Sequence, residues 1–397
     1  MTMSLTGSCT DAAVVDTETV TGEAAAATMR GLDTSSEAAL RHSGRLYVPI
    51  GDLDTEDSGR VGPVTIAYES WGTLNAAKDN AILVEHALTG DAHITGARGP
   101  GQPSPGWWDG MVGPNTPLDT ERFFVICTNV LGGCMGTTGP SSIAEDGKPY
   151  GSRFPRVTIR DQVAAEIELA DALGIDTFAA VIGGSMGGMR AIEWAVSAPE
   201  RVRRSVVIAS TAAASADQIA WAAPQIAAIR LDPNYRGGDY YNGATPTDGL
   251  SVARQIAHTT YRTATELTSR FGRDPQPGED PAHGGRYAVE SYLEYHGRKL
   301  VQRFDPNSYL VLTEAMNSHD IGRGRGGVEA ALKRVTADVT VASVDSDRLY
   351  LSSESDRIAA GVPNGRAQTL IHSAYGHDGF LVEADQVATL IRAALAR

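Results

Sequence analysis

The 397-residue chain has few cysteines, few aromatic residues and no excess of positive charge. Three cysteines (Cys9, Cys127 and Cys134) are too few for a disulfide framework and lack metal-ligand spacing, so we expect a reducing, cytoplasmic location. The formal net charge of -14 argues against a nucleic-acid partner, because such a partner requires a basic surface. The composition therefore predicts neither a disulfide-rich protein nor a nucleic-acid binder.

Long apolar runs are also missing. No run approaches the length of a membrane-spanning helix, and no basic stretch followed by an apolar segment marks a secretory signal. Residues 1–40 are rich in Ala, Thr, Ser and Glu and poor in large apolar side chains, a composition that cannot support a packed core. We therefore expect no membrane partner and predict that residues 1–40 form a flexible N-terminal extension.

The most informative segment present is Gly183–Gly187, which has the pattern Gly-x-Ser-x-Gly around Ser185. Residues 178–182 form a short apolar run typical of a buried strand, and residues 188–198 have apolar side chains at helical spacing. A strand, this pattern and a helix together indicate a nucleophile elbow, where glycines make room for a strained serine. The alternative is a structural glycine-rich turn. We predict that Ser185 is a nucleophile.

A nucleophile elbow predicts an acid and then a histidine further along the chain, each on a loop after a late strand. The run Val339–Asp345 predicts a strand that leads directly to Asp347. The run Ala367–Ser373 predicts another strand, and His377 follows it in a glycine-containing loop. This order favours a triad of Ser185, Asp347 and His377.

Each position of the predicted triad has competitors nearby. Asp345 competes with Asp347 for the acid, but we expect it to end the strand, while Asp347 begins the loop. Asp356 lies beyond a serine turn, where we expect it to cap a helix. His372 lies within the apolar run and is expected to be a packed or edge histidine, which favours His377 as the base.

Strand-like and helix-like segments alternate along most of the chain, which indicates an α/β protein with a mostly parallel sheet of about eight strands. The helix-like segment 161–173, ended by Gly174, is typical of a crossover connection. We assign residues 41–210 and 335–397 to this catalytic core. The predicted strands are 45–50, 64–68, 81–85, 123–128, 178–182, 205–209, 339–345 and 367–373.

The alternation stops in residues 211–334, which we call the helical insertion. Segments 218–230 and 249–257 have helical periodicity, and residues 274–285 are polar and rich in Gly and Pro. A helical lid between two core strands is the simplest interpretation. Placed there, it would cover the active site.

Two backbone amides are predicted to form an oxyanion hole. One belongs to Met186, directly after the nucleophile, and the other comes from the loop after an early strand. The strand Ala81–Glu85 leads to that loop, where Leu88 is the candidate, although an ordinary turn is an equally good interpretation. We predict no metal site, because no carboxylate or thiol completes a ligand set with His86 and His93.

These motifs together resemble the homoserine O-acetyltransferase family of the α/β-hydrolase superfamily, in its actinobacterial form. The resemblance covers nearly everything after residue 45 and is far more specific than the elbow alone. One departure is Tyr350, where relatives more often have Phe, and it leaves the acid in place. The matching segments are 86–91, 106–109, 129–134, 136–140, 183–188, 249–254, 304–309, 345–349 and 375–380.

The resemblance implies the same triad of Ser185, Asp347 and His377. It also implies that Arg254 and Asp378 hold the α-carboxylate and the α-ammonium of L-homoserine. Acetyl-CoA is implied as a co-substrate, with no permanently bound cofactor. A homodimer assembled through the helical insertion is implied as well.

The implied reaction is a ping-pong transfer of an acetyl group from acetyl-CoA to L-homoserine through an acetyl-Ser185 intermediate. O-acetyl-L-homoserine and CoA are then the products, for methionine biosynthesis. Rival interpretations on the same scaffold are a homoserine O-succinyltransferase, a serine O-acetyltransferase, an acetyltransferase of antibiotic precursors, an esterase or a catalytically inactive binding protein.

Overall fold

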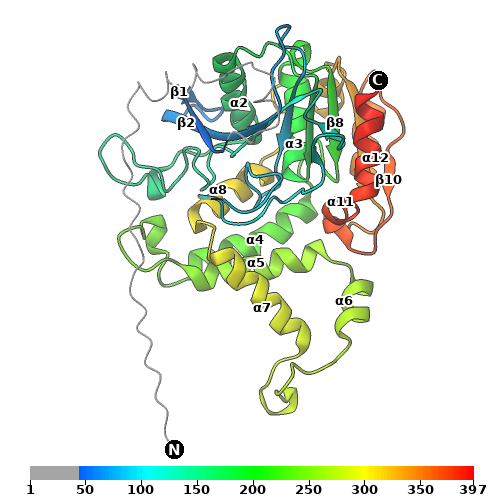
Figure 1. The fold of residues 1–397 in the computed structure, drawn as a ribbon. Coiled ribbons are helices and arrows are strands. Elements are labelled where there is room, and N and C mark those ends of the chain that lie inside the picture. Colours follow the sequence, from blue (N-terminus) through cyan, green and yellow to red (C-terminus); the bar gives the residue numbers. More distant parts are fainter. Residues whose placement is uncertain (1–43, 100) are drawn as a thin grey trace, which may run out of the picture. The chain divides into compact units, whose positions relative to one another are not determined.

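The computed structural model describes residues 44–99 and 101–397, so the predicted extension at residues 1–40 lies outside the described residues. The centre is an eight-stranded sheet of order β1-β2-β6-β3-β7-β8-β9-β10 (Figure 1). Strands β6, β3, β7, β8, β9 and β10 run parallel, whereas β2 pairs antiparallel with β1 and β6. The predicted fold class is confirmed. The strands are β1 (Leu46–Asp54), β2 (Arg60–Trp71), β3 (Ala81–Glu85), β6 (Phe124–Thr128), β7 (Ala180–Gly184), β8 (Arg204–Ile208), β9 (Asp338–Val344) and β10 (Thr369–Ile371).

The largest differences from the predicted strands lie at the two edges of the sheet. Strands β1 and β2 are longer than predicted because they pair with each other over most of their length. Strand β10 keeps only three residues of the predicted 367–373, since it pairs with β9 alone. A separate two-stranded pair, β4 (Val112–Gly113) with β5 (Leu118–Asp119), was not predicted, because two-residue strands leave no readable periodicity.

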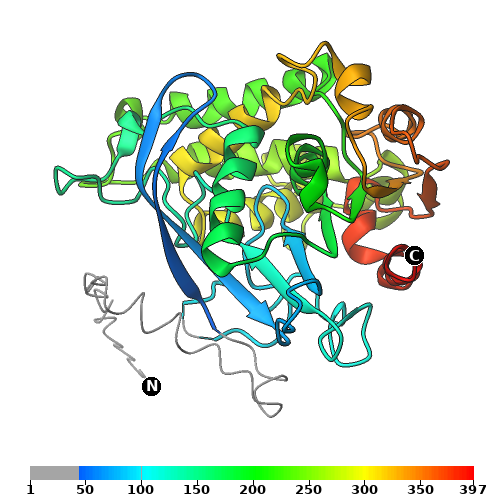
Figure 2. The ribbon, with the colours of Figure 1, turned by 90° about the horizontal axis from the view of Figure 1, so that it is seen from above.

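Helices cover both faces of the sheet. The helices α2 and α3 pack on one face and α12 on the other, and Figure 2 shows them on separate sides (green and red). Helix α2 starts at a capping box between Thr158 and Asp161, two residues before the predicted 161–173, and ends at Gly174. The helices flanking the sheet are α2 (Ile159–Leu173), α3 (Met186–Ser197), α10 (Ser352–Gly361), α11 (Gly379–Val382) and α12 (Ala384–Leu395).

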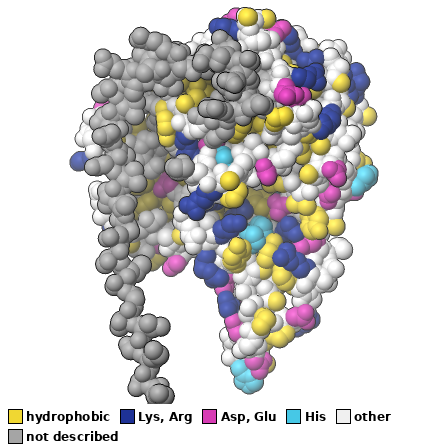
Figure 3. All heavy atoms as spheres, viewed as in Figure 1, with side chains coloured by type: hydrophobic (Ala, Val, Ile, Leu, Met, Phe, Trp, Pro, Cys, Tyr) yellow, Lys and Arg dark blue, Asp and Glu magenta, His cyan; other side chains and the backbone are white. Residues whose placement is uncertain are grey.

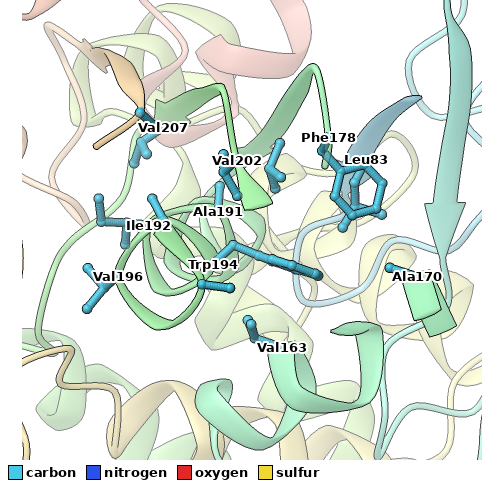
Figure 4. Packing of buried hydrophobic residues seen from close by; sticks show 14 of the residues in the cluster. Leu83, Val163, Ala170, Phe178, Ala191, Ile192, Trp194, Val196, Val202 and Val207 are labelled. Atoms are coloured by element: carbon cyan, nitrogen blue, oxygen red, sulfur yellow. The ribbon is translucent and has the colours of Figure 1, made fainter. Parts of the chain in front are cut away.

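The buried core follows the alternation of side chains along the strands. In β3, Leu83 belongs to the cluster under α2 and α3, while Ile82 belongs to the cluster under α12. Trp194 of α3 is fully buried and packs edge-to-face on Phe178 at 5.4 Å between ring centroids (Figure 4). This packing fixes α3, and with it the elbow at its N-terminus, against the sheet.

The chain between β8 and β9 is helical and lies along one side of the core (Figure 1). A third apolar cluster joins this segment to the core, because Leu88 and Met186 pack in it with Ile229, Leu250 and Leu300. The helices therefore lie over the strand ends next to Ser185. They are α4 (Ala216–Leu231), α5 (Thr247–Tyr261), α6 (Ala264–Phe271), α7 (Ala288–Val301), α8 (Pro306–Asn317) and α9 (Val328–Leu332).

None of the helices within the described residues is both long and apolar enough to cross a membrane.

Candidate active site

Ser185 stands at a sharp turn between β7 and α3, with φ 57° and ψ -124°. A side chain other than that of glycine on either side would collide with the backbone. A Cβ at Gly183 would lie 2.2 Å from the Gly187 carbonyl, and one at Gly187 would lie 2.0 Å from the Glu85 carbonyl oxygen. The structure therefore has the geometry of a nucleophile elbow, in which the neighbouring residues hold the backbone of Ser185 at a positive φ.

Three predicted residues meet in one hydrogen-bonded relay. Ser185 Oγ lies 2.9 Å from His377 Nε2, and His377 Nδ1 lies 2.6 Å from Asp347 Oδ2. All three residues are buried. Since a carboxylate only accepts, His377 carries its proton on Nδ1, and Nε2 is free to take the proton of Ser185. This is the arrangement of a serine, base and acid in acyl transfer.

The second oxygen of the acid is held by the backbone. Asp347 Oδ1 accepts the N–H groups of Leu349 at 2.8 Å and Tyr350 at 3.0 Å, which fixes the carboxylate toward the imidazole. Burial lowers the pKa of His377, but the charge and hydrogen bond of Asp347 outweigh it, and the net pKa is raised. The relay therefore makes His377 a stronger base than its burial alone would allow.

The competing acids and histidine lie elsewhere. Asp345 pairs at 2.8 Å with His372, whose side chain is 73% exposed, at the outer edge of the sheet. Asp356 lies inside α10 and not at its start, so the prediction that it caps a helix is wrong. His372 lies at the edge of the sheet, just after β10, where its contacts within the described chain are with Asp345 and Gln386 and not with Ser185.

The two predicted oxyanion donors lie close to the elbow. Leu88 and Met186 pack in one apolar cluster, on the loop after β3 and at the first residue of α3. Neither backbone N–H donates a hydrogen bond to any residue between 44 and 99 or between 101 and 397. Two buried, unengaged donors next to Ser185 are what an oxyanion hole requires.

Of the two predicted substrate residues, Asp378 directly follows the base, and Arg254 is connected to it through Tyr261. Asp378 follows His377 on the 3-10 turn Gly376–Asp378, and its carboxylate lies 3.3 Å from Arg262. Arg254 lies over the ring of Tyr261 at 5.4 Å, and no carboxylate of the described chain comes within ion-pair distance of it. Burial raises the pKa of Asp378, and the nearby His377, Arg254 and Arg262 only partly oppose this. A guanidinium without an ion pair in the described chain therefore stacks on the ring that lies beside the imidazole, and a carboxylate follows the imidazole in the chain.

Sequence reasoning missed two aromatic residues that enclose the base. The ring of Tyr350 lies 5.0 Å from that of His377, and the ring of Tyr261 lies 5.7 Å from it. Tyr261 follows Arg254 by seven residues on α5, which is two helical turns, so their shared face was a readable signal. Nothing in the sequence pattern indicated the contact of Tyr350.

A cavity of about 50 Å3 adjoins this group. Core residues Leu88 and Tyr350 form one side, and α4, α5 and α8 form the other. None of the described residues that line it carries a charge. This space, which Leu88 and Tyr350 border, therefore suits a small, neutral group.

The histidines and the thiol near the site have other roles. His93 Nδ1 lies 2.9 Å from Glu69, and both nitrogens of His86 contact backbone groups. Burial raises the pKa of Cys134 to about 12, so its thiol is a poor nucleophile. In the described part of the chain, no group of three or more His, Cys, Asp or Glu could hold a metal ion.

Comparisons with known proteins place this site in a family. The α/β hydrolase fold family matches residues 80–384. Homoserine O-acetyltransferase of Thermobifida fusca is 59% identical over 356 residues, covering 89% of this chain and 94% of the relative. That of Mycobacterium avium is 55% identical over 350 residues, covering 88% and 89%. This chain belongs to the homoserine O-acetyltransferase family.

Solved structures show how far the family shares its fold with other enzymes. The homoserine O-acetyltransferase from Bacillus anthracis has a TM-score of 0.81 and 27% identity, covering 89% of this chain and 97% of that one. Esterase E22 has a TM-score of 0.82 and 28% identity, covering 89% and 100%. Because transferase and esterase structures match equally well, the fold does not separate the homoserine O-acetyltransferase family from esterases.

Proposed function

We propose that this protein transfers the acetyl group of acetyl-CoA to the hydroxyl of L-homoserine by a ping-pong mechanism. The observation that carries this proposal is that Asp378 directly follows His377, and that Arg254 stacks on Tyr261, whose ring lies beside His377 at the end of the Asp347–His377–Ser185 relay. An esterase needs only the relay. A transferase must also hold an acceptor.

In the first half-reaction, His377 Nε2 takes the proton of Ser185, and Oγ attacks the thioester carbonyl of acetyl-CoA. The amides of Leu88 and Met186 would stabilise the oxyanion, by about 3 kcal/mol each. The carbon–sulfur bond then breaks, and the CoA sulfur takes the proton from His377. Acetyl-CoA is thus a co-substrate that is consumed and released as CoA in each cycle, and no permanently bound cofactor is needed.

In the second half-reaction, His377 takes the proton of the homoserine hydroxyl, whose oxygen attacks the acetyl-Ser185 carbonyl. The bond to Oγ breaks, Oγ takes the proton, and O-acetyl-L-homoserine leaves. Arg254 is suited to a bidentate contact with the α-carboxylate, and Asp378 to the α-ammonium. Holding both charges aims the hydroxyl at the ester, so that homoserine competes with water.

The donor is proposed to be acetyl-CoA and not succinyl-CoA, because the cavity bordered by Leu88, Tyr261 and Tyr350 has an uncharged lining. The free carboxylate of a succinyl group would require a cation there.

The decisive experiment separates the two half-reactions. Acetyl-CoA alone should add one acetyl group to the peptide that contains Ser185, as seen by mass spectrometry. Adding L-homoserine should then remove it and release O-acetyl-L-homoserine. Release of CoA at the same rate without homoserine would show a hydrolase instead. A faster reaction with succinyl-CoA would contradict the proposed donor. A faster reaction with L-serine would contradict the proposed acceptor.

A homodimer through the helical insertion is also part of the proposal. Large apolar side chains are exposed on α4, α5 and α7, and α5 packs against both of the other helices. The side chain of Leu231 is 81% exposed in the single chain, and an apolar surface of this kind supports an interface with a second copy. Sedimentation should give a dimer, and Leu231→Asp should shift it toward monomer. The exposed residues are Ile219, Trp221, Leu231, Val252 and Tyr295.

The proposed place of action is the cytoplasm, as a step of methionine biosynthesis. Cys127 and Cys134 are free thiols, in keeping with a reducing compartment.

A further inference from the structure

The peptide unit between Ala87 and Leu88, near the nucleophile, is held by two hydrogen bonds to its carbonyl oxygen. The carbonyl of Ala87 accepts two hydrogen bonds, from the backbone N–H of Gly90 at 2.9 Å and from His86 Nδ1 at 2.8 Å. The bond from Ala87 to Leu88 is trans, so the N–H of Leu88 points opposite to that carbonyl. Whatever holds the Ala87 oxygen therefore also sets the direction of the Leu88 N–H.

The partners of His86 fix its tautomer. The Ala87 oxygen can only accept, so Nδ1 carries the proton, and the backbone N–H of Val130 donates to Nε2 at 3.2 Å. His86 is 2% exposed, and burial together with the charges of Arg190 and Arg303 lowers its pKa to about 3. The imidazole is thus neutral at physiological pH and serves as one donor and one acceptor.

A buried cation holds the same loop from its other side. Arg190 of α3 is fully buried and donates to the carbonyl oxygen of His86 at 2.8 Å. Its guanidinium also pairs with Glu85 at 2.7 Å and Glu166 at 2.8 Å. Burial raises the pKa of Glu85 well above its ordinary value, and the charge of Arg190 only partly opposes this.

Stability alone does not explain this buried cluster, because well-packed apolar residues in place of buried ions are often as stable or more so. The cluster does join two functional elements. Arg190 belongs to the helix that begins with Met186, and its contact is two residues before Leu88. The two proposed oxyanion donors are thus connected through buried polar groups.

We propose that His86 is a positioning residue that orients the Leu88 N–H toward the oxyanion formed at Ser185. This inference rests on the proposed acyl transfer, and it concerns any acyl donor that Ser185 attacks. His86 does not touch the reacting atoms. It acts through the Ala87–Leu88 peptide, with Arg190 holding the preceding carbonyl.

The test compares two amides that imitate different nitrogens of the ring. In His86→Asn, the amide can donate to the Ala87 oxygen from near the position of Nδ1. In His86→Gln, the amide reaches the position of Nε2 and leaves the Ala87 oxygen without its side-chain donor. The readout is the first-order rate of Ser185 acetylation by p-nitrophenyl acetate, which forms the same oxyanion without CoA or homoserine.

We expect Gln to slow acetylation by about 100-fold at unchanged substrate KM, and Asn by less than about tenfold. A purely structural role predicts the opposite order, since Gln matches histidine better in size. Acetylation of the Gln variant as fast as that of the Asn variant would overturn the proposal. If wild type reacts with p-nitrophenyl acetate but not with acetyl-CoA, the proposed function fails and this test still stands.

A matched control is His319, another buried histidine, whose Nε2 contacts the carbonyl oxygen of Thr211 at 3.1 Å away from the oxyanion loop. His319→Gln and His319→Asn should lower the melting temperature with little change in the acetylation rate. A measurement on wild type avoids folding defects altogether. Nitrogen NMR should show His86 as the Nδ1–H tautomer without titration between about pH 5 and 9. The other tautomer, or a titration in that range, would contradict the proposal.

Discussion

The catalytic core and the helical insertion differ in how firmly they hold their functional side chains. Every residue of β3, β6 and β7 is buried, whereas α7 buries only Gly297 and Leu300. The relay of the core has contacts of 2.6 and 2.9 Å, while Arg254 on the insertion has a ring beneath it and no ion pair within the described residues. The reacting groups are therefore fixed, and the proposed recognition group is left available to a ligand.

The two regions also differ in where their charges lie. The core buries Arg190 between two carboxylates. On the face seen in Figure 3, Lys and Arg side chains instead gather at the surface where the insertion meets the core. The buried ions hold neighbouring segments of the core in place. Surface cations can instead attract an anionic substrate such as acetyl-CoA, against the net charge of -14. Changes at the Asp347–His377–Ser185 relay of the core should therefore alter chemistry, and a change at Arg254 of the insertion should alter binding.

The strongest test of this division is Ser185→Ala. Turnover should fall by about 10⁶, because the covalent step is lost, while binding of both substrates persists. Steady-state rates and mass spectrometry of the elbow peptide measure the two effects. Acetylation that survives in this variant would place the nucleophile elsewhere.

Asp347→Asn should reduce kcat by about 10⁴, since an amide favours the wrong tautomer of His377. Asp345→Asn is the matched control, because the carboxylate of Asp345 contacts exposed His372 and backbone amides, and the relay does not include it. It should change kcat by less than about twofold. Equal losses in the two variants would contradict the assignment of the acid.

Arg254→Ala should raise the KM for homoserine by about 100-fold, from the loss of charged hydrogen bonds, and leave acetylation of Ser185 nearly unchanged. Arg270→Ala removes a nearby cation that stacks on Phe271 and Tyr292, and it serves as control. Stopped-flow measurement of each half-reaction separates the effects. A parallel fall in both half-reactions would show that Arg254 belongs to the chemistry.

The pH profile should report the raised pKa of His377. Only neutral imidazole accepts the serine proton, so activity falls as acid protonates it, about tenfold per pH unit. Because Asp347 raises that pKa, the decline should begin above the ordinary midpoint of about 6.5. Asp347→Asn should move the midpoint downward. A midpoint lower in wild type than in this variant would contradict the relay.

The smallest expected effect belongs to Tyr350→Phe. The ring against His377 is kept, and only a hydroxyl beside Ser185 and the cavity is lost. A neutral hydrogen bond contributes about 1 kcal/mol, so kcat should fall by about fivefold. A loss above about 100-fold would instead make this hydroxyl part of the chemistry.

The core could be predicted from sequence because its strands and the elbow depend on residues that are close together in the chain. Apolar runs mark buried strands, and the steric demand at Ser185 marks the elbow through Gly183 and Gly187. Chain order then narrowed the acid and base to a few candidates. The choice of Asp347 over Asp345 agrees with the direction of their loops, one toward His377 and the other toward the exposed edge.

The contacts around the site could not be predicted, because they depend on packing between distant segments. The pairing of Arg262 with Asp378 joins residues 116 positions apart. The link from Arg190 to the His86 carbonyl spans 104 positions. Without coordinates, Arg190 is only a cation in an apolar helix, and nothing in its spacing reveals two buried carboxylates.

The turn Gly376–Asp378 has a consequence for the acceptor's size. His377 and the proposed ammonium anchor, Asp378, are consecutive residues there, so covalent geometry keeps their Cα atoms about 3.8 Å apart. An acceptor held by its ammonium group at Asp378 would therefore be anchored on the residue next to the base. Serine is shorter than homoserine by one carbon–carbon bond, about 1.5 Å, so we expect its oxygen to lie farther from the imidazole than that of homoserine.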